Sequence, residues 1–115
     1  MTTYALFVFN GDPMCFIHVL LNALDMHQRG DGVRLVIEGA ATGLLPELEK
    51  EGHPLHKLWR KALGAGLVDG VCKACAAKTG GLETARKLGL VLLDEMNGHP
   101  SMAAYRQAGC ELVTF

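Results

Sequence analysis

Residues 4–13 read Tyr-Ala-Leu-Phe-Val-Phe-Asn-Gly-Asp-Pro, and they contain a complete transition from one structural element to the next. The first six are a continuous apolar run rich in β-forming side chains, which is typical of a strand covered on both faces. Asn10-Gly11 interrupts this run, and Asp12 followed by Pro13 is a favoured N-cap and first residue of a helix. The stretch therefore predicts a buried strand that leads directly into a helix.

The same alternation continues to the end of the sequence. Helical spacing of apolar residues, with glycine and proline at the breaks, predicts helices at 13–29, 46–50, 55–63, 73–78 and 82–88, and a last one from His99-Pro100 to Gly109. Further strands are predicted at 33–38, 67–72, 90–93 and 110–115. Strands that alternate with helices through short loops form right-handed crossovers. We therefore expect one α/β domain spanning residues 1–115, with three layers (α/β/α) and a mostly parallel five-stranded sheet.

Composition excludes several classes of protein. The chain has 115 residues, a formal net charge of -1 and only 6% aromatic residues, which argues against a nucleic-acid partner. The N-terminal segment lacks the basic residues of a secretory signal, and no apolar run is long enough to cross a membrane. Four cysteines are too few for a disulfide scaffold. We expect a soluble, cytoplasmic protein with reduced thiols and no membrane partner.

Polar side chains cluster where the predicted strands end. Sites in open α/β sheets form beyond the carboxyl ends of the strands. One rim should therefore gather the side chains that follow the first four strands, namely Asn10, Gly11, Asp12, Cys15, Glu38, Cys72, Cys75, Asp94, Glu95, Asn97 and His99. Cys110 begins the fifth strand and should lie at the opposite rim.

Cys72 is the main candidate for chemistry. It stands at a strand end and a helix start, where amide N–H groups and the helix dipole favour a thiolate, and Lys73 adds a positive charge. We therefore expect the Cys72 sulfur to be open to solvent and held as an anion. The alternative is a small buried side chain that only packs at the end of a strand.

Cys72 and Cys75 form a Cys-x-x-Cys pair with three interpretations. A thioredoxin-like dithiol would follow the first strand of its fold, not the third. Half of a zinc site would need two more ligands, for which only Cys15, His18 and His99 are plausible. A pair in which one thiol carries the chemistry and the other resolves or packs needs nothing further. We adopt the third interpretation and assign no metal.

Two other side chains are candidate neighbours of this pair. Cys15 lies near the start of the first helix and either packs in the core or acts beside Cys72. His99 either orients and deprotonates a thiol or caps the last helix. Asn10, Gly11 and Lys73 are the candidate substrate-binding residues. Glycine-rich dinucleotide and phosphate-binding motifs are missing, so no cofactor is predicted.

The order and spacing of several pieces resemble the DsrE/DsrF-like family of small α/β proteins associated with sulfur relay. These pieces are the opening strand with Asn10-Gly11-Asp12-Pro13, then Val71-Cys72 with a helix closing at Gly80, and finally a helix with Tyr105 before Gly109 and residues 111–115. The resemblance implies that a cysteine placed like Cys72 takes up sulfane sulfur as a persulfide. It also implies homo- or hetero-oligomers, often trimers or hexamers. Cys75 is an additional thiol beside the single one usual in the family.

The expected function is that of a sulfur carrier or sulfurtransferase-like protein. Cys72 would accept sulfane sulfur from a donor protein and release it to an acceptor thiol, Cys75 would resolve the persulfide, and Cys15 and His99 would be neighbours. Two alternatives remain on the same fold. One is a non-catalytic module that binds a small ligand or a metal, and the other is a structural or regulatory oligomer.

Overall fold

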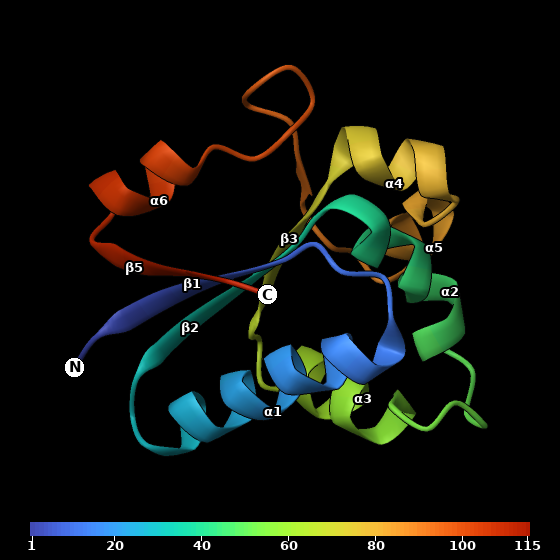
Figure 1. The fold of residues 1–115 in the computed structure, drawn as a ribbon, viewed down its shortest axis with the longest axis horizontal. Helices are drawn as coiled ribbons and strands as arrows, with labels where there is room; N and C mark the ends of the chain where they lie inside the picture. The colour runs from blue at the N-terminus through green and yellow to red at the C-terminus, as the bar shows by residue number, and fades with distance from the viewer.

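The computed structural model describes residues 1–115, and its elements follow the predicted alternation (Figure 1). The strands are β1 (Thr3–Val8), β2 (Gly32–Ile37), β3 (Val68–Cys72), β4 (Leu92–Leu93) and β5 (Cys110–Thr114). The helices are α1 (Pro13–Gln28), the 3-10 helix η1 (Gly39–Leu44), α2 (Leu45–Leu48), α3 (His56–Gly64), α4 (Lys73–Thr79), α5 (Leu82–Lys87) and α6 (Met102–Gln107). The backbone N–H of Met14 donates to Asp12 Oδ1 at 2.9 Å, so the predicted N-cap of α1 is confirmed.

The five strands form one sheet in the order β4-β3-β2-β1-β5, and every pair is parallel. The predicted three-layer α/β/α class is therefore confirmed, with a sheet that is wholly rather than mostly parallel. β1 lies between β2 and β5, where Leu6 pairs with Leu35 on one side and with Val113 on the other. This central position explains why its sequence is a continuous apolar run.

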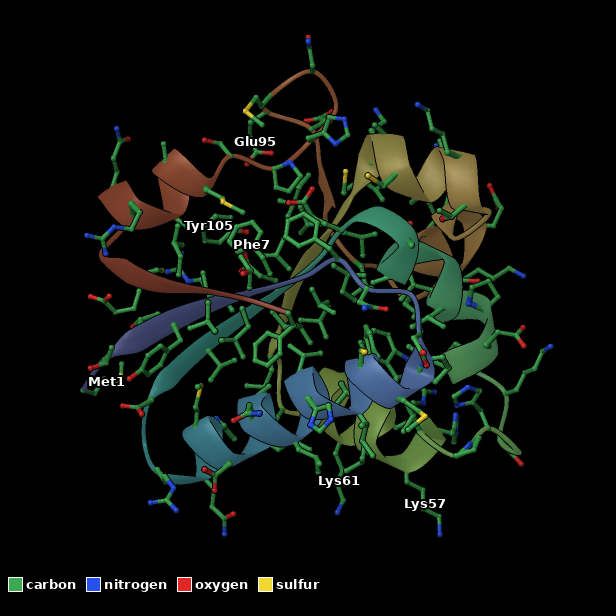
Figure 2. All side chains as sticks on the ribbon, in the orientation of Figure 1. Met1, Phe7, Lys57, Lys61, Glu95 and Tyr105 are labelled. Atoms are coloured by element: carbon green, nitrogen blue, oxygen red, sulfur yellow. The ribbon has the colours of Figure 1, made fainter.

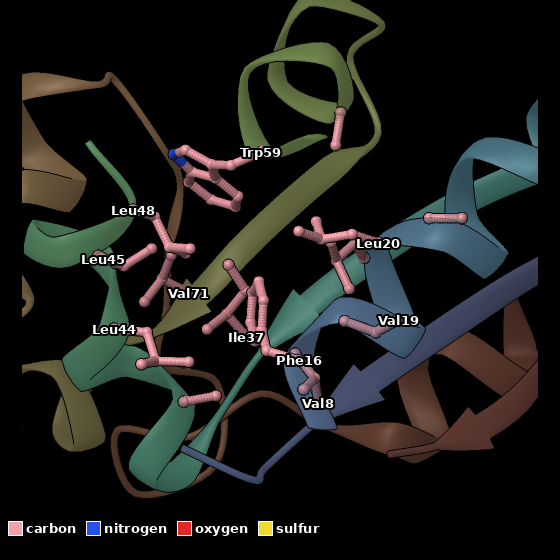
Figure 3. Close-up of a cluster of buried hydrophobic side chains, with 14 of the residues drawn as sticks. Val8, Phe16, Val19, Leu20, Ile37, Leu44, Leu45, Leu48, Trp59 and Val71 are labelled. Carbon is pink, nitrogen blue, oxygen red and sulfur yellow. The ribbon is translucent and has the colours of Figure 1, made fainter. Parts of the chain in front are cut away.

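One face of the sheet carries the larger core. Alternate side chains of the central strands, such as Leu6 and Leu35, point to this face, which α1 and α3 cover together with η1, α2, α4 and α5. Trp59 of α3 is fully buried there, 6.3 Å from Phe16 between ring centroids (Figure 3). Its indole N–H donates to Glu49 Oε2 at 2.9 Å, which satisfies the only polar atom of the ring.

The opposite face is covered by α6. Phe7 of β1 meets Tyr105 of α6 edge to face, with ring centroids 5.3 Å apart (Figure 2). The Tyr105 hydroxyl donates to the Asp69 carboxylate of β3. Burial, followed by this hydrogen bond and the negative charge of Asp69, raises the pKa of Tyr105 above its ordinary value. This single helix therefore packs on the sheet through one aromatic side chain with a paired hydroxyl.

The last helix begins later than the sequence predicted. His99-Pro100 does not open it, because α6 starts at Met102 with Ser101 as its N-cap, whose hydroxyl accepts from the Ala104 N–H at 3.2 Å. An Xaa-Pro pair can open a helix, as Asp12-Pro13 does in α1, but here the capping hydroxyl is that of Ser101, two residues further on. This leaves His99 in the loop between β4 and α6.

None of the helices combines the length and the apolar character that crossing a membrane would require.

Candidate functional site

The site lies where two neighbouring strands send the chain to opposite faces of the sheet. After β3 the chain enters α4 on the face of the larger core, whereas after β4 it crosses to α6 on the other face (Figure 1). Cys72 is the last residue of β3, and His99 lies in the connection that follows β4. Ligands of open α/β sheets bind at such switch points, beyond the carboxyl ends of the strands.

Four side chains converge at this point. One ligand-type atom from each of Glu38, Cys72, Cys75 and His99 lies within 4.8 Å of the others. Cys72 Sγ is 3.0 Å from His99 Nδ1, and Cys75 Sγ is 3.7 Å from the same nitrogen. The predicted meeting of Cys72, Cys75 and His99 is therefore present, and Glu38 joins them from the end of β2.

A tight turn presents His99 to the two thiols. Asn97 and Gly98 both have positive φ, at 52° and 87°, and hydrogen bonds of 2.8 and 2.9 Å join the backbones of Met96 and His99 on either side. The Gly98 carbonyl then accepts from the Ala74 N–H at 2.9 Å, which fixes the turn against the first residues of α4. Asn-Gly is the sequence signal of a turn with two positive φ values. Asn97-Gly98 is therefore the sequence signal for the position of His99.

Cys72 is buried, and this contradicts the prediction of a solvent-open thiolate. Its side chain has no exposed surface, and desolvation raises the pKa of the Cys72 thiol to about 12. The backbone N–H of Cys75 donates to the Cys72 sulfur and lowers the pKa, as expected at a helix start, but burial has the larger effect. The Cys72 thiol therefore keeps its proton at neutral pH, and its sulfur lies 3.7 Å from the Gly98 carbonyl oxygen, to which it donates, and 3.0 Å from His99 Nδ1.

Glu38 is the member of the cluster that the sequence placed at the shared rim without assigning it a role. It is only 7% exposed, and burial raises the pKa of its carboxyl group against the opposing effects of His99 and Cys72. None of the six ion pairs of the protein includes it. Its place at a strand end was the only available signal, and strand ends commonly carry polar residues that have no role.

The predicted substrate-binding residues lie outside the cluster. The Lys73 ammonium pairs with Asp94 at 3.6 Å, and both side chains are about half exposed. Lys73 is therefore engaged by a carboxylate and does not contribute to the pKa shift of Cys72. Asn10 Oδ1 accepts from the Asp12 N–H at 2.8 Å, and Gly11 packs against Ala40, where a Cβ atom would lie 2.9 Å from the carbonyl oxygen. Asn10 and Gly11 therefore shape the loop that enters α1.

The other cysteines do not join the pair. Cys15 is half-buried in the first turn of α1 and is not among the clustered side chains, so its predicted place beside Cys72 is wrong. Cys110 begins β5 opposite Thr3, the first residue of β1, which confirms its place at the other end of the sheet. All four cysteines are free. The available thiol chemistry is thus concentrated at Cys72 and Cys75.

An open cavity of about 400 Å³ adjoins the cluster, and Glu38 and His99 form part of its wall. The remaining wall comes from the β1 loop and from the segment leading into α6, with Phe9, Met96, Pro100, Ser101, Met102 and Ala103. Phe9, Met96 and Met102 are partly exposed apolar side chains. The cavity therefore offers a mostly apolar surface with an imidazole and a carboxyl group at its inner end.

Comparison with known proteins places the chain among archaeal relatives. Neither a protein-family profile nor a solved structure matches it. A protein of Archaeoglobus fulgidus described as uncharacterized is 38% identical over 56 residues, which cover 49% of this chain and 90% of the relative. The uncharacterized protein MJ0733 of Methanocaldococcus jannaschii is 31% identical over 97 residues, which cover 84% of this chain and 77% of the relative. The chain therefore belongs to the same family as the M. jannaschii protein.

Proposed function

We propose that this protein is a sulfur carrier that holds sulfane sulfur as a persulfide on Cys75. The observation that carries the proposal is the surroundings of the Cys75 sulfur. This side chain is half-buried rather than sealed, its Sγ lies 3.7 Å from His99 Nδ1, and its neighbour in the cluster is the Cys72 thiol, which keeps its proton. Burial of Cys72 moves the accepting role from Cys72, the residue expected from the sequence, to Cys75.

The transfer uses thiolate displacement. His99 takes the proton of the Cys75 thiol, and the resulting thiolate attacks the terminal sulfur of a donor persulfide, R–S–SH. The donor S–S bond breaks, the donor leaves as R–S⁻ and receives the proton from His99, and Cys75 carries –S–SH. In the release step an acceptor thiolate attacks the terminal sulfur, and the Cys75 thiolate is the leaving group.

Cys72 has a second effect on the lifetime of this persulfide. A Cys72 thiolate would attack the inner sulfur of the Cys75 persulfide, form a Cys72–Cys75 disulfide and expel hydrosulfide. The pKa of Cys72, about 12, keeps this thiol protonated and slows that loss. A buried neighbour that stays protonated is therefore suited to a carrier rather than to a protein that releases sulfide.

The partners in this proposal are a donor persulfide protein and an acceptor thiol protein, and a second copy of the chain. The resemblance to DsrE/DsrF-like proteins supports a homo-oligomer. The reaction would take place in the cytoplasm, where thiols are kept reduced. The donor and the acceptor would reach Cys75 through the part of its side chain that is exposed.

Intact-mass measurement after incubation with glutathione persulfide tests the proposal on chelator-treated full-length protein. The expected result is a gain of one sulfur atom that a thiol reductant removes. Cys75→Ala should lose this gain, whereas the matched variants Cys15→Ala and Cys110→Ala should keep it. No added sulfur on the native protein, or undiminished loading of Cys75→Ala, would overturn the proposal.

A further inference from the structure

The geometry points to a Zn²⁺ site formed by Glu38, Cys72, Cys75 and His99. This inference does not rest on the proposed function, because metal binding is measured without any sulfur donor. In this site Glu38 is the fourth ligand, which the sequence alone did not identify. The sequence offered Cys15 and His18 as candidate ligands, whereas the structure brings the Glu38 carboxylate to the cysteines and His99.

The spacing of the four donor atoms suits a tetrahedral ion. Zinc–sulfur bonds of about 2.3 Å and zinc–nitrogen bonds of about 2.0–2.1 Å place neighbouring ligand atoms roughly 3.3–3.8 Å apart. His99 Nδ1 is 3.0 Å from Cys72 Sγ and 3.7 Å from Cys75 Sγ, and all four donors lie within 4.8 Å of one another. Adjustments on the order of 1 Å or less would therefore complete a tetrahedron.

The donor types select the metal. Two thiolates exclude magnesium and calcium, which take oxygen ligands, whereas zinc accepts sulfur, imidazole nitrogen and carboxylate oxygen together. Cys72 and Cys75 also have the Cys-x-x-Cys spacing of zinc ligands. With His99 and Glu38, the protein supplies four ligands of the kinds that zinc takes.

The Glu38 side chain is not used by any lysine or arginine of the protein. Glu38 is 7% exposed and belongs to none of the six ion pairs, and the nearby Lys73 pairs with Asp94 instead. The oxygen atoms of Glu38 are therefore free to act as metal ligands beside the two sulfurs and the imidazole.

The backbone already holds the ligands in place. Glu38 follows β2, Cys72 ends β3, Cys75 lies in the first turn of α4, and the hydrogen-bonded 96–99 turn carries His99. β2 and β3 are paired neighbours in the sheet. Metal binding therefore needs side-chain rotation rather than rearrangement of the chain. Because zinc would use the same sulfur lone pairs as the persulfide chemistry, the zinc-bound protein should not load sulfur.

The test uses full-length protein that is stripped with EDTA, incubated with Zn²⁺ and desalted, and its metal content is measured. One zinc per chain is expected. Co²⁺ serves as the spectroscopic probe, and tetrahedral d–d bands with thiolate charge-transfer absorption are expected. Glu38→Gln and His99→Gln should weaken zinc binding at least about tenfold. The matched variants Cys15→Ser and Cys110→Ser should bind as the native protein does.

Three results would overturn the inference. They are the loss of all zinc on desalting, an octahedral cobalt spectrum, and unchanged affinity in both Glu38→Gln and His99→Gln, which would mean that the two thiols alone bind the metal. The cobalt spectrum of the native protein decides the question even where a variant misfolds. If the protein binds zinc but the metal-free protein does not load sulfur, only the proposed function is overturned. If it loads sulfur but does not bind zinc, only the zinc site is overturned.

Discussion

Cys72 Sγ lies 3.0 Å from His99 Nδ1 although the two residues are 27 positions apart in the sequence. The contact exists because β3 and β4 are parallel neighbours whose carboxyl ends meet at one rim, where Cys72 pairs with Leu93 in the last register position. The chain leaves these two strands toward opposite faces, so the pair stands in the crevice between the two connections. This contact joins the two cysteines at the start of α4 to the histidine of the 96–99 turn.

The four cysteines should react with an alkylating reagent in a defined order. In chelator-treated native protein, the half-buried Cys15 and Cys75 should be labelled before Cys72 and Cys110, which have no exposed surface. The raised pKa of Cys72 adds to its protection because only the thiolate reacts. Iodoacetamide labelling followed by peptide mass spectrometry measures the order, with denatured protein as the reference. Labelling of Cys72 ahead of Cys75 would contradict the assignment of the accepting thiol.

Gly98→Ala should disable the site more than it destabilises the fold. Its φ of +87° is unfavourable for alanine, and the added Cβ would lie 3.0 Å from the Ala74 Cβ, which would push the His99 turn off α4. Gly66→Ala is the matched control, since its φ is also positive, at +72°, but no atom lies within 4 Å of the new Cβ. Both variants should lose about 1–2 kcal/mol of stability in urea unfolding. Only Gly98→Ala should lose zinc, and equal retention in the two variants would refute this account of the turn.

Tyr105→Phe should reduce stability and flatten its alkaline pH dependence. The substitution leaves the Asp69 carboxylate without its donor, at a cost of about 1–3 kcal/mol, while the contact with Phe7 remains. Because the pKa of Tyr105 is raised in the folded protein, the unfolded chain loses this proton first as the pH rises above about 10. The native protein therefore loses stability through that range. Urea unfolding at neutral and alkaline pH should show a smaller loss in Tyr105→Phe.

Trp59→Ala should be among the most damaging single substitutions in the core. It removes a fully buried ring and leaves the Glu49 carboxylate without the indole donor, for about 3–5 kcal/mol of lost stability. Lys57→Ala and Lys61→Ala provide controls on the same helix, since both side chains point outward from α3 (Figure 2). These two should stay within about 0.5 kcal/mol of the native protein. Circular dichroism during urea unfolding measures all three, because the first variant lacks the only tryptophan.

The fold could be predicted because the apolar runs, the helix starts and the breaks between them all indicate the same alternation of strands and helices. The Asp12-Pro13 helix start and the continuous apolar run of β1 were both present in the sequence, and both are found in the structure. The start of α6 was misplaced because His99-Pro100 and Ser101 lie within three residues, and only the hydrogen bond from Ala104 to Ser101 decides between them.

The site was predicted in part, for a physical reason. The rule that strand ends share a rim brought Cys72, Cys75 and His99 together, but it could not give burial, which depends on packing from several segments. Burial is what reversed the predicted state of the Cys72 thiol. It also separated Glu38, which points into the cluster, from Lys73, which pairs with Asp94 at the surface. The same rule predicted Cys15 at this rim, but Cys15 lies in α1 and is not part of the cluster.

β4 is an edge strand that pairs with β3 through two residues only, Leu92 and Leu93. Such a short edge opens by local fluctuation at a much lower free energy than the central strands do. When it opens and the Ala74–Gly98 hydrogen bond breaks with it, the imidazole departs with the 96–99 turn, while Cys72 at the end of β3 and Glu38 directly after β2 stay with strands that remain paired. Local opening of this edge would therefore separate His99 from the other residues of the site and bring it back while the interior of the domain stays folded. Amide hydrogen exchange at Met96 and His99 would measure how often the edge opens.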